Sequence, residues 1–257
     1  MTTILIDAGN SRLKWALLTA GERSPQQALA YGGHSPQAGA LQHLQALLAH
    51  YPAVTRVVLV HVLGEAFAHE AQACCDLAGR DLLLVKSGDA YGVRVAYPNP
   101  AHLGADRFVG LLATRRLVPG QAALVIDAGT AVTVDGLYAD GTHLGGLILP
   151  GLQLLGDVLI SRTQAKHMDA ALFDNPVVFA NNTPQAMGSG CLFALVGALE
   201  GICQRMQQQM QEPAGIILCG GDAALLHAHV RFNALLHPDA LMDGLHYLAE
   251  QAACTPC

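Results

Sequence analysis

ILIDAGNS at Ile4–Ser11 and LVIDAGTA at Leu124–Ala131 share the core Ile-Asp-Ala-Gly, with Asp7 and Asp127 120 residues apart. Each copy ends an apolar run typical of a buried strand, and a second such run follows it. Each therefore predicts two antiparallel strands joined by an acidic, glycine-containing turn. Chance explains one such turn, but not two at matching places in two similar halves.

The two halves continue in parallel after these hairpins. In the first half, a looser third strand (27–33) precedes a helix (39–51), a strand (55–63), a helix (65–78) and a strand (81–87). The second half predicts a third strand after a hairpin turn at Asp140-Gly141, then a helix (184–210), a strand (215–221) and a closing helix (242–252). Pro119 and Gly120 form the predicted joint, which gives domains 1–118 and 119–257.

The composition fits a folded chain without affinity for polyanions. Of its 257 residues 52% are hydrophobic and 13% charged, and the net charge is −6, which disfavours binding to nucleic acid or to an anionic membrane. Apolar runs such as residues 145–160 are too short or too broken to span a bilayer, so we expect buried strands and loops there.

The chain start and the cysteines indicate a cytoplasmic protein. The first ten residues lack the features of a secretory signal. Seven cysteines are an odd number, and reduced, mostly buried thiols are the expectation in such a chain. The terminal CTPC has the spacing of a metal or redox pair, but no second pair supports a metal site and no strand–helix context a redox one.

Both turns have the composition of a phosphate-binding backbone. Glycine and small hydroxylated residues let N–H groups approach phosphate oxygens, as 9–11 and 129–131 could. Asp7 and Asp127 would repel a phosphate unless cations lie between them, so we expect magnesium. The chain has neither a G-x-x-x-x-G-K-[ST] stretch nor a strand-linked G-x-G-x-x-G, so neither a P-loop nor a dinucleotide fold is indicated.

Two acidic glycine turns and a late Gly220-Gly221 pair after a strand resemble the superfamily of acetate and sugar kinases, Hsp70 and actin. Within it, DAGNSRLKWALL, YPNPAHLGADR, DAGTAVTVD, GGLILPG, and SRT followed by NTPQAMGSG are together similar to type III pantothenate kinases. The resemblance runs from Ile4 to about Leu226. It implies an α/β fold of two ribonuclease H-like domains, the actin-like ATPase duplication, facing across a nucleotide cleft.

The resemblance also implies the reaction and its partners. A family member transfers the γ-phosphoryl group of ATP to pantothenate, which gives 4'-phosphopantothenate and begins coenzyme A synthesis. It works as a homodimer and depends on a monovalent cation, K⁺ or NH₄⁺.

The site residues that the resemblance implies are those at positions of this chain that match the family's motifs. The ATP-binding residues are Asp7, Ala8, Gly9, Asn10, Ser11, Arg12, Leu13, Lys14, Thr130, Gly220 and Gly221. The substrate-binding residues are Tyr97, Gly104, Ala105, Asp106, Arg107 and Thr183. Asp127 would bind the monovalent cation, and Asp106 would be the general base.

The residues alone leave simpler alternatives open. The pattern over 104–117 predicts an amphipathic helix whose first turn holds Asp106 and Arg107, so Asp106 could merely stabilise its own helix, with Arg107 on a solvated face. Tyr97 alone would suit core or loop packing, and Thr183 alone a helix N-cap.

Two other functions also stay open at this point. One is another small-molecule kinase or a phosphatase of the same superfamily. The other is a regulatory accessory factor that acts through a protein partner, since the net charge of −6 disfavours direct contact with DNA.

Overall fold

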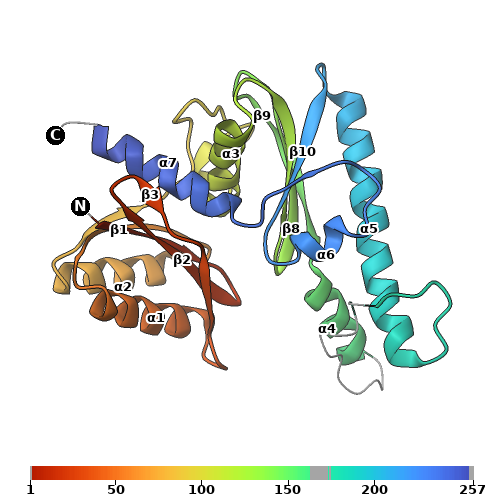
Figure 1. Cartoon of the computed structure of the whole chain (residues 1–257), viewed down its shortest axis with the longest axis horizontal. Coiled ribbons are helices and arrows are strands. Elements are labelled where there is room, and N and C mark those ends of the chain that lie inside the picture. Colours follow the sequence, from red (N-terminus) through yellow and green to blue (C-terminus); the bar gives the residue numbers. More distant parts are fainter. Residues whose placement is uncertain (1, 163–172, 174, 255–257) are drawn as a thin grey trace. The chain divides into compact units, whose positions relative to one another are not determined.

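A computed structural model describes residues 2–162, 173 and 175–254 (Figure 1). The chain divides into two compact units: the first comprises the residues up to Pro119 and the segment that starts at Asp239, and the second comprises Gly120–Pro238. The predicted joint at Pro119 and Gly120 coincides with this boundary. The C-terminal segment, which the sequence analysis placed in the second domain, instead groups with the first unit.

The sheet of the first unit has the strand order β3-β2-β1-β5-β6, and β4 pairs with β2. Its strands are β1 (Thr2–Ala8), β2 (Arg12–Thr19), β3 (Glu22–Arg23), β4 (Gln27–Ala30), β5 (Val54–His61) and β6 (Asp81–Leu84). β1 is antiparallel to β2 but parallel to β5, and β5 is parallel to β6. The predicted hairpin around Asp7 is therefore confirmed.

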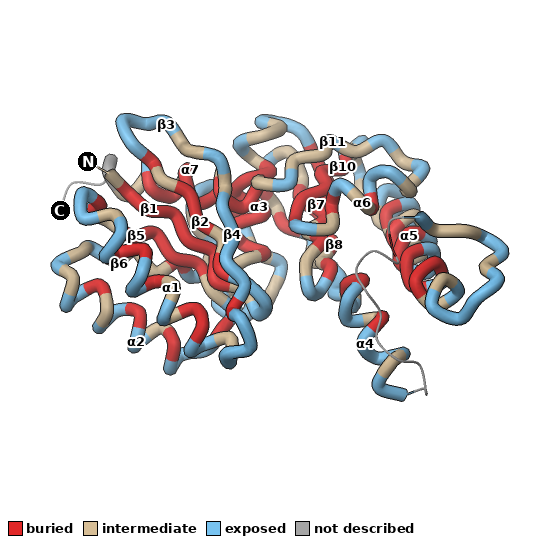
Figure 2. The backbone as a smooth tube through the Cα atoms, turned by 60° about the horizontal axis from the view of Figure 1, so that its bottom comes forward, coloured by how far each residue is buried: buried red, intermediate tan, exposed pale blue. Residues whose placement is uncertain are grey.

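Helices cover both faces of this sheet (Figure 1). They are α1 (Pro36–His50), α2 (Gly64–Leu77), α3 (Ala105–Leu117) and α7 (Ala240–Cys254), with a short 3₁₀ turn η1 (Pro100–His102) before α3. Ile4 and Ile6 pack into the core beneath α1 and α2. Since side chains alternate along a strand, Leu5 and Asp7 face the other side, which α3 and α7 cover. Figure 2 shows that β1 is buried almost throughout.

The second unit repeats the topology of the first. Its strand order is β11-β10-β7-β8-β9. The strands are β7 (Ala122–Ala128), β8 (Ala131–Leu137), β9 (His143–Pro150), β10 (Ala214–Cys219) and β11 (Leu235–Leu236). As in the first unit, the leading three strands form an antiparallel meander and the last two join in parallel. This correspondence confirms that the two acidic turns occupy equivalent places in a duplicated α/β fold.

Three helices pack on one face of the second sheet: α4 (Leu152–Arg162), α5 (Thr183–Gln209) and α6 (Ala223–His227). α5 is long and apolar enough, by length and composition, to cross a membrane. Its side chains Leu192, Leu195 and Leu199 lie in the core of the unit, which explains the apolar composition.

The prediction of buried strands and loops over 145–160 was wrong in two respects: residues up to Pro150 form strand β9, but Leu147 and Ile148 on it are 47% and 64% exposed, and the residues after Gly151 form a helix. Gly151 follows the strand, and it packs so closely on the carbonyls of Gly129 and Thr130 that a side chain would not fit. The leucine-rich run that follows forms α4, and Val158 on this helix is 53% exposed. The apolar run therefore supplies one half-buried helix instead of core strand.

Five of the cysteines are free thiols: Cys74, Cys75, Cys191, Cys203 and Cys219. Four of them are buried and Cys74 is half-buried, as expected. Burial raises the pKa of Cys75 and of Cys203 to about 12, so these thiols are unreactive at neutral pH. The CTPC motif lies almost wholly outside the described residues.

The placement of α7 gives a stability prediction. Leu245 is fully buried on α7, and truncating a buried leucine typically costs about 2–5 kcal/mol. We expect Leu245→Ala to lower the free energy of unfolding by an amount in this range, measured by urea denaturation. Leu77→Ala, on an α2 residue that is 91% exposed, should change it by less than about 0.5 kcal/mol. Equal effects would show that α7 is not part of the core.

Candidate active site

The first acidic turn connects β1 to β2. Asp7 lies opposite Lys14 in the strand register, and the Lys14 Nζ is 3.6 Å from the Asp7 Oδ2. The Gly9 N–H donates to the Arg12 carbonyl at 3.2 Å and closes the turn. Asn10, Ser11 and Arg12 are exposed. The predicted phosphate-binding turn therefore exists as a tight, solvent-facing loop.

Asp7 and Asp106 interact although they are distant in the sequence. Burial raises the pKa of the Asp7 carboxyl above its usual value, Lys14 lowers that pKa, and the charge of Asp106 raises it again. The acidic turn of β1 and the N-terminus of α3 thus lie within electrostatic range of each other in the first unit. Two carboxylates and an ammonium group in one place form an electrostatic arrangement that a divalent cation would relieve.

The Asp106 carboxylate folds back over the start of its own helix. Its Oδ1 accepts a hydrogen bond from the Arg107 N–H at 2.8 Å. A Cβ atom on Gly104, the N-cap residue of α3, would lie 2.6 Å from the same oxygen. Glycine at position 104 therefore leaves room for this carboxylate. Asp106 therefore stabilises the start of its own helix, as the simpler alternative expects. Whether it also acts as a general base is a question for experiment.

Arg107 and Tyr97 are brought into direct contact. The Arg107 Nη1 donates to the Tyr97 hydroxyl at 2.9 Å, and the guanidinium carbon lies 5.8 Å from the centre of the tyrosine ring. Arg107 is only 8% exposed. It therefore does not lie on a solvated helix face, and the simpler interpretation of this residue is wrong.

The second acidic turn lies between β7 and β8, and Gly220, which follows β10, packs against it. The Gly129 N–H donates to the Ala131 carbonyl at 3.1 Å, so this turn is closed from the equivalent glycine but is one residue shorter than the first. Gly220 has φ +96°, and a Cβ there would overlap the Ala128 carbonyl and the Asp127 carboxylate. Asp127, Thr130 and Gly220 are thus grouped within the second unit, whereas a Cβ on Gly221 would meet nothing within 4 Å.

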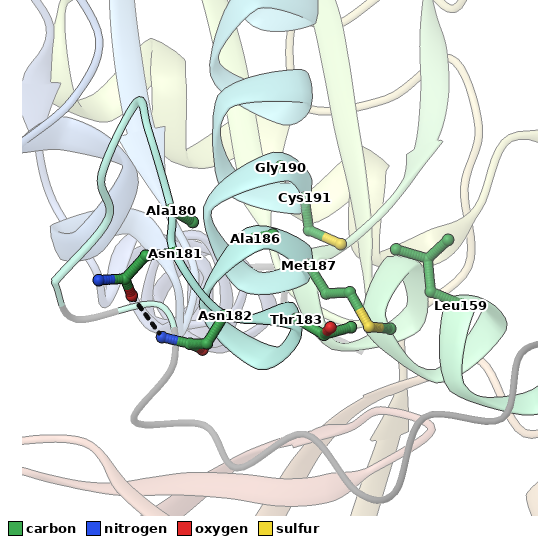
Figure 3. Close-up of a pocket in the computed structure, with 9 residues that line it drawn as sticks. All are labelled: Leu159, Ala180, Asn181, Asn182, Thr183, Ala186, Met187, Gly190 and Cys191. Atoms are coloured by element: carbon green, nitrogen blue, oxygen red, sulfur yellow. Dashed lines mark hydrogen bonds between the residues drawn. The ribbon is translucent and has the colours of Figure 1, made fainter.

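Thr183 belongs to the second unit, whereas the other substrate-binding candidates belong to the first. It is the first residue of α5, and the N-cap is Asn182, whose side chain accepts from the Gln185 N–H at 3.0 Å. The alternative that made Thr183 the N-cap is therefore wrong. Figure 3 shows Thr183 in a cavity of about 610 Å³ between α4 and the start of α5. The cavity is lined by Leu159, Ala180, Asn181, Asn182, Thr183, Ala186, Met187, Gly190 and Cys191.

Tyr31 is a residue near the site that the sequence analysis missed. Its hydroxyl donates to the Gly9 carbonyl at 2.8 Å, from a position just after β4. The surrounding sequence, QALAYGG, predicts only a strand. A hydrogen bond across 22 residues leaves no local pattern that could have revealed it.

The residues present suit magnesium and a nucleotide. Within the described ranges, no group of three or more His, Cys, Asp or Glu side chains could form a complete protein cage for a metal. Magnesium typically uses one or two carboxylates together with phosphate oxygens and water, so it needs no such cage. Asp7, buried beside the exposed first turn, is a suitable carboxylate.

Comparisons with known proteins identify the family. A family model described as type III pantothenate kinase matches residues 3–205. A type III pantothenate kinase of Azoarcus sp. is 37% identical and covers 99% of this chain and 93% of its own length. One of Herminiimonas arsenicoxydans is 34% identical, with 96% of both chains covered. The chain belongs to the type III pantothenate kinase family. Its members use ATP to phosphorylate pantothenate, the first step of coenzyme A synthesis.

Solved structures agree on the fold of this pantothenate kinase family member. MreB5 of Spiroplasma citri, bound to ADP, has a TM-score of 0.59 at 9% identity and covers 98% of this chain and 97% of its own. A Campylobacter jejuni protein described as a Baf family transcriptional activator has a TM-score of 0.61 at 16% identity, covering 98% and 100%. At such identities the likeness shows the actin-like ATPase fold alone.

The environment of Asp7 predicts how activity depends on pH. Lys14 lowers the Asp7 pKa, so removing its ammonium group should raise that pKa further. If ATP binding needs the Asp7 carboxylate, activity falls as pH drops through this pKa. The acid limb of the kcat/KM profile for ATP should therefore move to higher pH in Lys14→Met. Lys86→Met, at an exposed site of the same unit, should leave the acid limb at the wild-type pH. An acid limb at the same pH in both variants would contradict the role given to the Asp7 carboxylate.

Proposed function

We propose that this chain phosphorylates the primary hydroxyl of pantothenate with Asp106 as general base, the first turn as the phosphate-binding loop and Arg107 as the partner of the pantothenate carboxylate. One observation carries the proposal: Asp7, Lys14 and Asp106 interact in one unit, next to the Arg107–Tyr97 pair. The residues proposed to bind the nucleotide and those proposed to bind the acceptor are far apart in sequence, and their location in one unit supports the proposal.

The general base of this reaction need not be strong. Phosphoryl transfer passes through a loose transition state in which the acceptor hydroxyl loses its proton late, so a weakly basic carboxylate is sufficient. N–H groups of the first turn and Lys14 would hold ATP phosphates, with Gly220 and Gly221 near the adenosine. A guanidinium group such as that of Arg107 binds a carboxylate in bidentate fashion, and its bond to Tyr97 holds it in one orientation. Gly104 and Ala105 begin the helix at this point. Thr183 as a further contact to pantothenate stays a prediction.

Two cations complete the proposal. Mg²⁺, held by Asp7 and the phosphates, would neutralise charge on the transferred group. Asp127 and Thr130 would hold K⁺ or NH₄⁺ beside the second turn. Both suggestions are supported by the oxygen donors of the turns and by the proximity of Asp127 to the Gly220 loop.

We expect turnover to require both cation types. With Mg²⁺ present, replacing K⁺ or NH₄⁺ by Na⁺ should strongly reduce the rate, because Na⁺ is smaller and fits poorly in a site that binds a larger ion. Initial rates at fixed ionic strength measure this. Full turnover in a sodium buffer that contains magnesium would remove the cation role from Asp127.

A homodimer in the cytoplasm is the proposed state of the protein. Val178 and Phe179, before α5, are 77% and 94% exposed, and apolar side chains on α4 are exposed as well. Exposed apolar groups of this kind favour contact with a second copy. Free thiols and the net charge of −6 suit a cytoplasmic protein that binds neither nucleic acid nor a membrane.

The test of the function is whether purified protein consumes ATP only when pantothenate is supplied. ADP release, followed by a coupled assay with and without pantothenate, measures this. ADP release at the same rate with and without pantothenate would favour another kinase or a phosphatase of the superfamily. No ADP release under any condition would favour the accessory-factor alternative.

A further inference from the structure

Resting on the proposed role of the first turn in ATP binding, we propose that Tyr31 is a positioning residue: by donating its hydroxyl hydrogen to the Gly9 carbonyl, it holds the turn in its phosphate-accepting orientation. Tyr31 follows β4, whose last residue, Ala30, pairs with Arg12. The tyrosine ring is therefore anchored directly beside the turn. Its hydroxyl lies 2.8 Å from the Gly9 oxygen.

The effect of Tyr31 on the turn depends on the geometry of one peptide plane. In a trans peptide the C=O of Gly9 and the N–H of Asn10 point in opposite directions. Because the carbonyl points toward buried Tyr31, the N–H of exposed Asn10 points away from it. A rotation of this plane would instead present a carbonyl oxygen to an incoming phosphate. The bond from Tyr31 opposes that rotation.

The other polar group of Gly9 is also engaged. Its N–H donates to the Arg12 carbonyl at 3.2 Å, so both sides of the glycine are tied. The backbone dihedrals of glycine change more freely than those of any other residue, so hydrogen bonds to both of its polar groups restrict its conformation most. Tyr31 thus fixes the one flexible residue between Asp7 and the exposed part of the turn.

The position of Tyr31 is itself determined by α1. The His43 Nε2 lies 2.9 Å from the Ala30 carbonyl, and the imidazole stacks on the Tyr31 ring at 5.9 Å between centroids. Gly39 leaves room for the ring, because a Cβ there would lie 2.6 Å from the Tyr31 Cβ. Burial, and then the charge of Asp7, raise the pKa of the phenol, so it remains a hydrogen-bond donor at neutral pH.

Tyr31→Phe removes only the hydroxyl group. A hydrogen bond of this kind contributes about 0.5–1.5 kcal/mol, which corresponds to a loss of roughly two- to tenfold in affinity. We expect calorimetry to show this loss for a non-hydrolysable ATP analogue, with pantothenate affinity changed by less than about twofold. Kinetically, KM for ATP should rise by a similar factor while kcat/KM for pantothenate at saturating ATP is kept. Hydrogen exchange of the amides in residues 9–12 should accelerate in the free protein.

Tyr51→Phe is the matched control. Tyr51 also contacts the core beneath α1, through an aromatic contact with Trp15 at 5.2 Å between ring centroids. Its substitution should leave the nucleotide affinity and the hydrogen exchange of the turn amides unchanged. Gly39→Ala should reproduce the nucleotide defect by displacing the Tyr31 ring.

The outcomes separate this proposal from the proposed function. Equal nucleotide affinity and equal exchange in the two Tyr→Phe variants would overturn it, and so would a parallel loss of nucleotide and pantothenate binding, which indicates a merely structural role. A wild-type protein that fails to phosphorylate pantothenate would overturn the proposed function, while exchange and nucleotide affinity would still decide the role of Tyr31.

Discussion

Asp106→Asn should lower kcat by at least about a hundredfold, because lost general-base assistance typically costs about 10²–10⁴-fold in rate. Asparagine keeps the size of the side chain and an oxygen that can accept from the Arg107 N–H, as the Asp106 Oδ1 does at 2.8 Å. The start of α3 should therefore remain intact. Only the proton acceptor is removed, and steady-state kinetics at saturating ATP and pantothenate measure the loss.

Binding of pantothenate should survive this change. The Arg107–Tyr97 contact does not depend on the charge of position 106, so calorimetry should still detect pantothenate. The control is Asp81→Asn, which makes the same chemical change in an exposed ion pair with Arg56 and should leave kcat within about twofold. Near-normal turnover of Asp106→Asn would reduce Asp106 to a helix-capping acid, and the base would have to be sought at Asp7 or Asp127.

Gly220→Ala should lower kcat/KM for ATP by about a hundredfold, since a displacement of about 1 Å at a reacting group can cost that much. The backbone at φ +96° disfavours any side chain, and the new methyl group would meet the Ala128 carbonyl and the Asp127 carboxylate. The second turn would have to move. Its proposed ligands, Asp127 and Thr130, would then be misplaced.

Gly215→Ala is the matched control for this substitution. Gly215 lies on the same strand, β10, is exposed, and has nothing within 4 Å of the place that an added methyl group would take. The variant should retain full activity and at least the original melting temperature, because alanine suits a strand better than glycine does. If Gly220→Ala kept its ATP kinetics, the Gly220 loop would have no part in holding the second turn.

The sequence predicted the duplicated architecture well, because hairpin patterns and acidic turns are local features. The strands around Asp7 and Asp127, the turn at Asp140-Gly141 and the long helix α5 all appear in the structure as expected. Periodicity alone could not assign α7 to the first unit. An apolar helix face shows that a helix packs, but not against which partner.

The candidate site was predicted in part. The resemblance to a kinase family supplied Asp106 and Arg107, and the structure places both at the start of α3 with Asp106 acting on Asp7. The bond from Tyr31 to Gly9 and the space that Gly104 leaves for Asp106 arise from tertiary packing. Contacts of that kind leave no periodic signal in a single sequence.

The proposed reaction transfers one phosphoryl group from ATP to pantothenate. The most direct measurement is ³¹P NMR of a reaction that contains purified protein, ATP, pantothenate, Mg²⁺ and K⁺. We expect equal amounts of ADP and 4'-phosphopantothenate, and no phosphomonoester when Asp106→Asn replaces the wild type under the same conditions. Formation of ADP and inorganic phosphate without 4'-phosphopantothenate would contradict it.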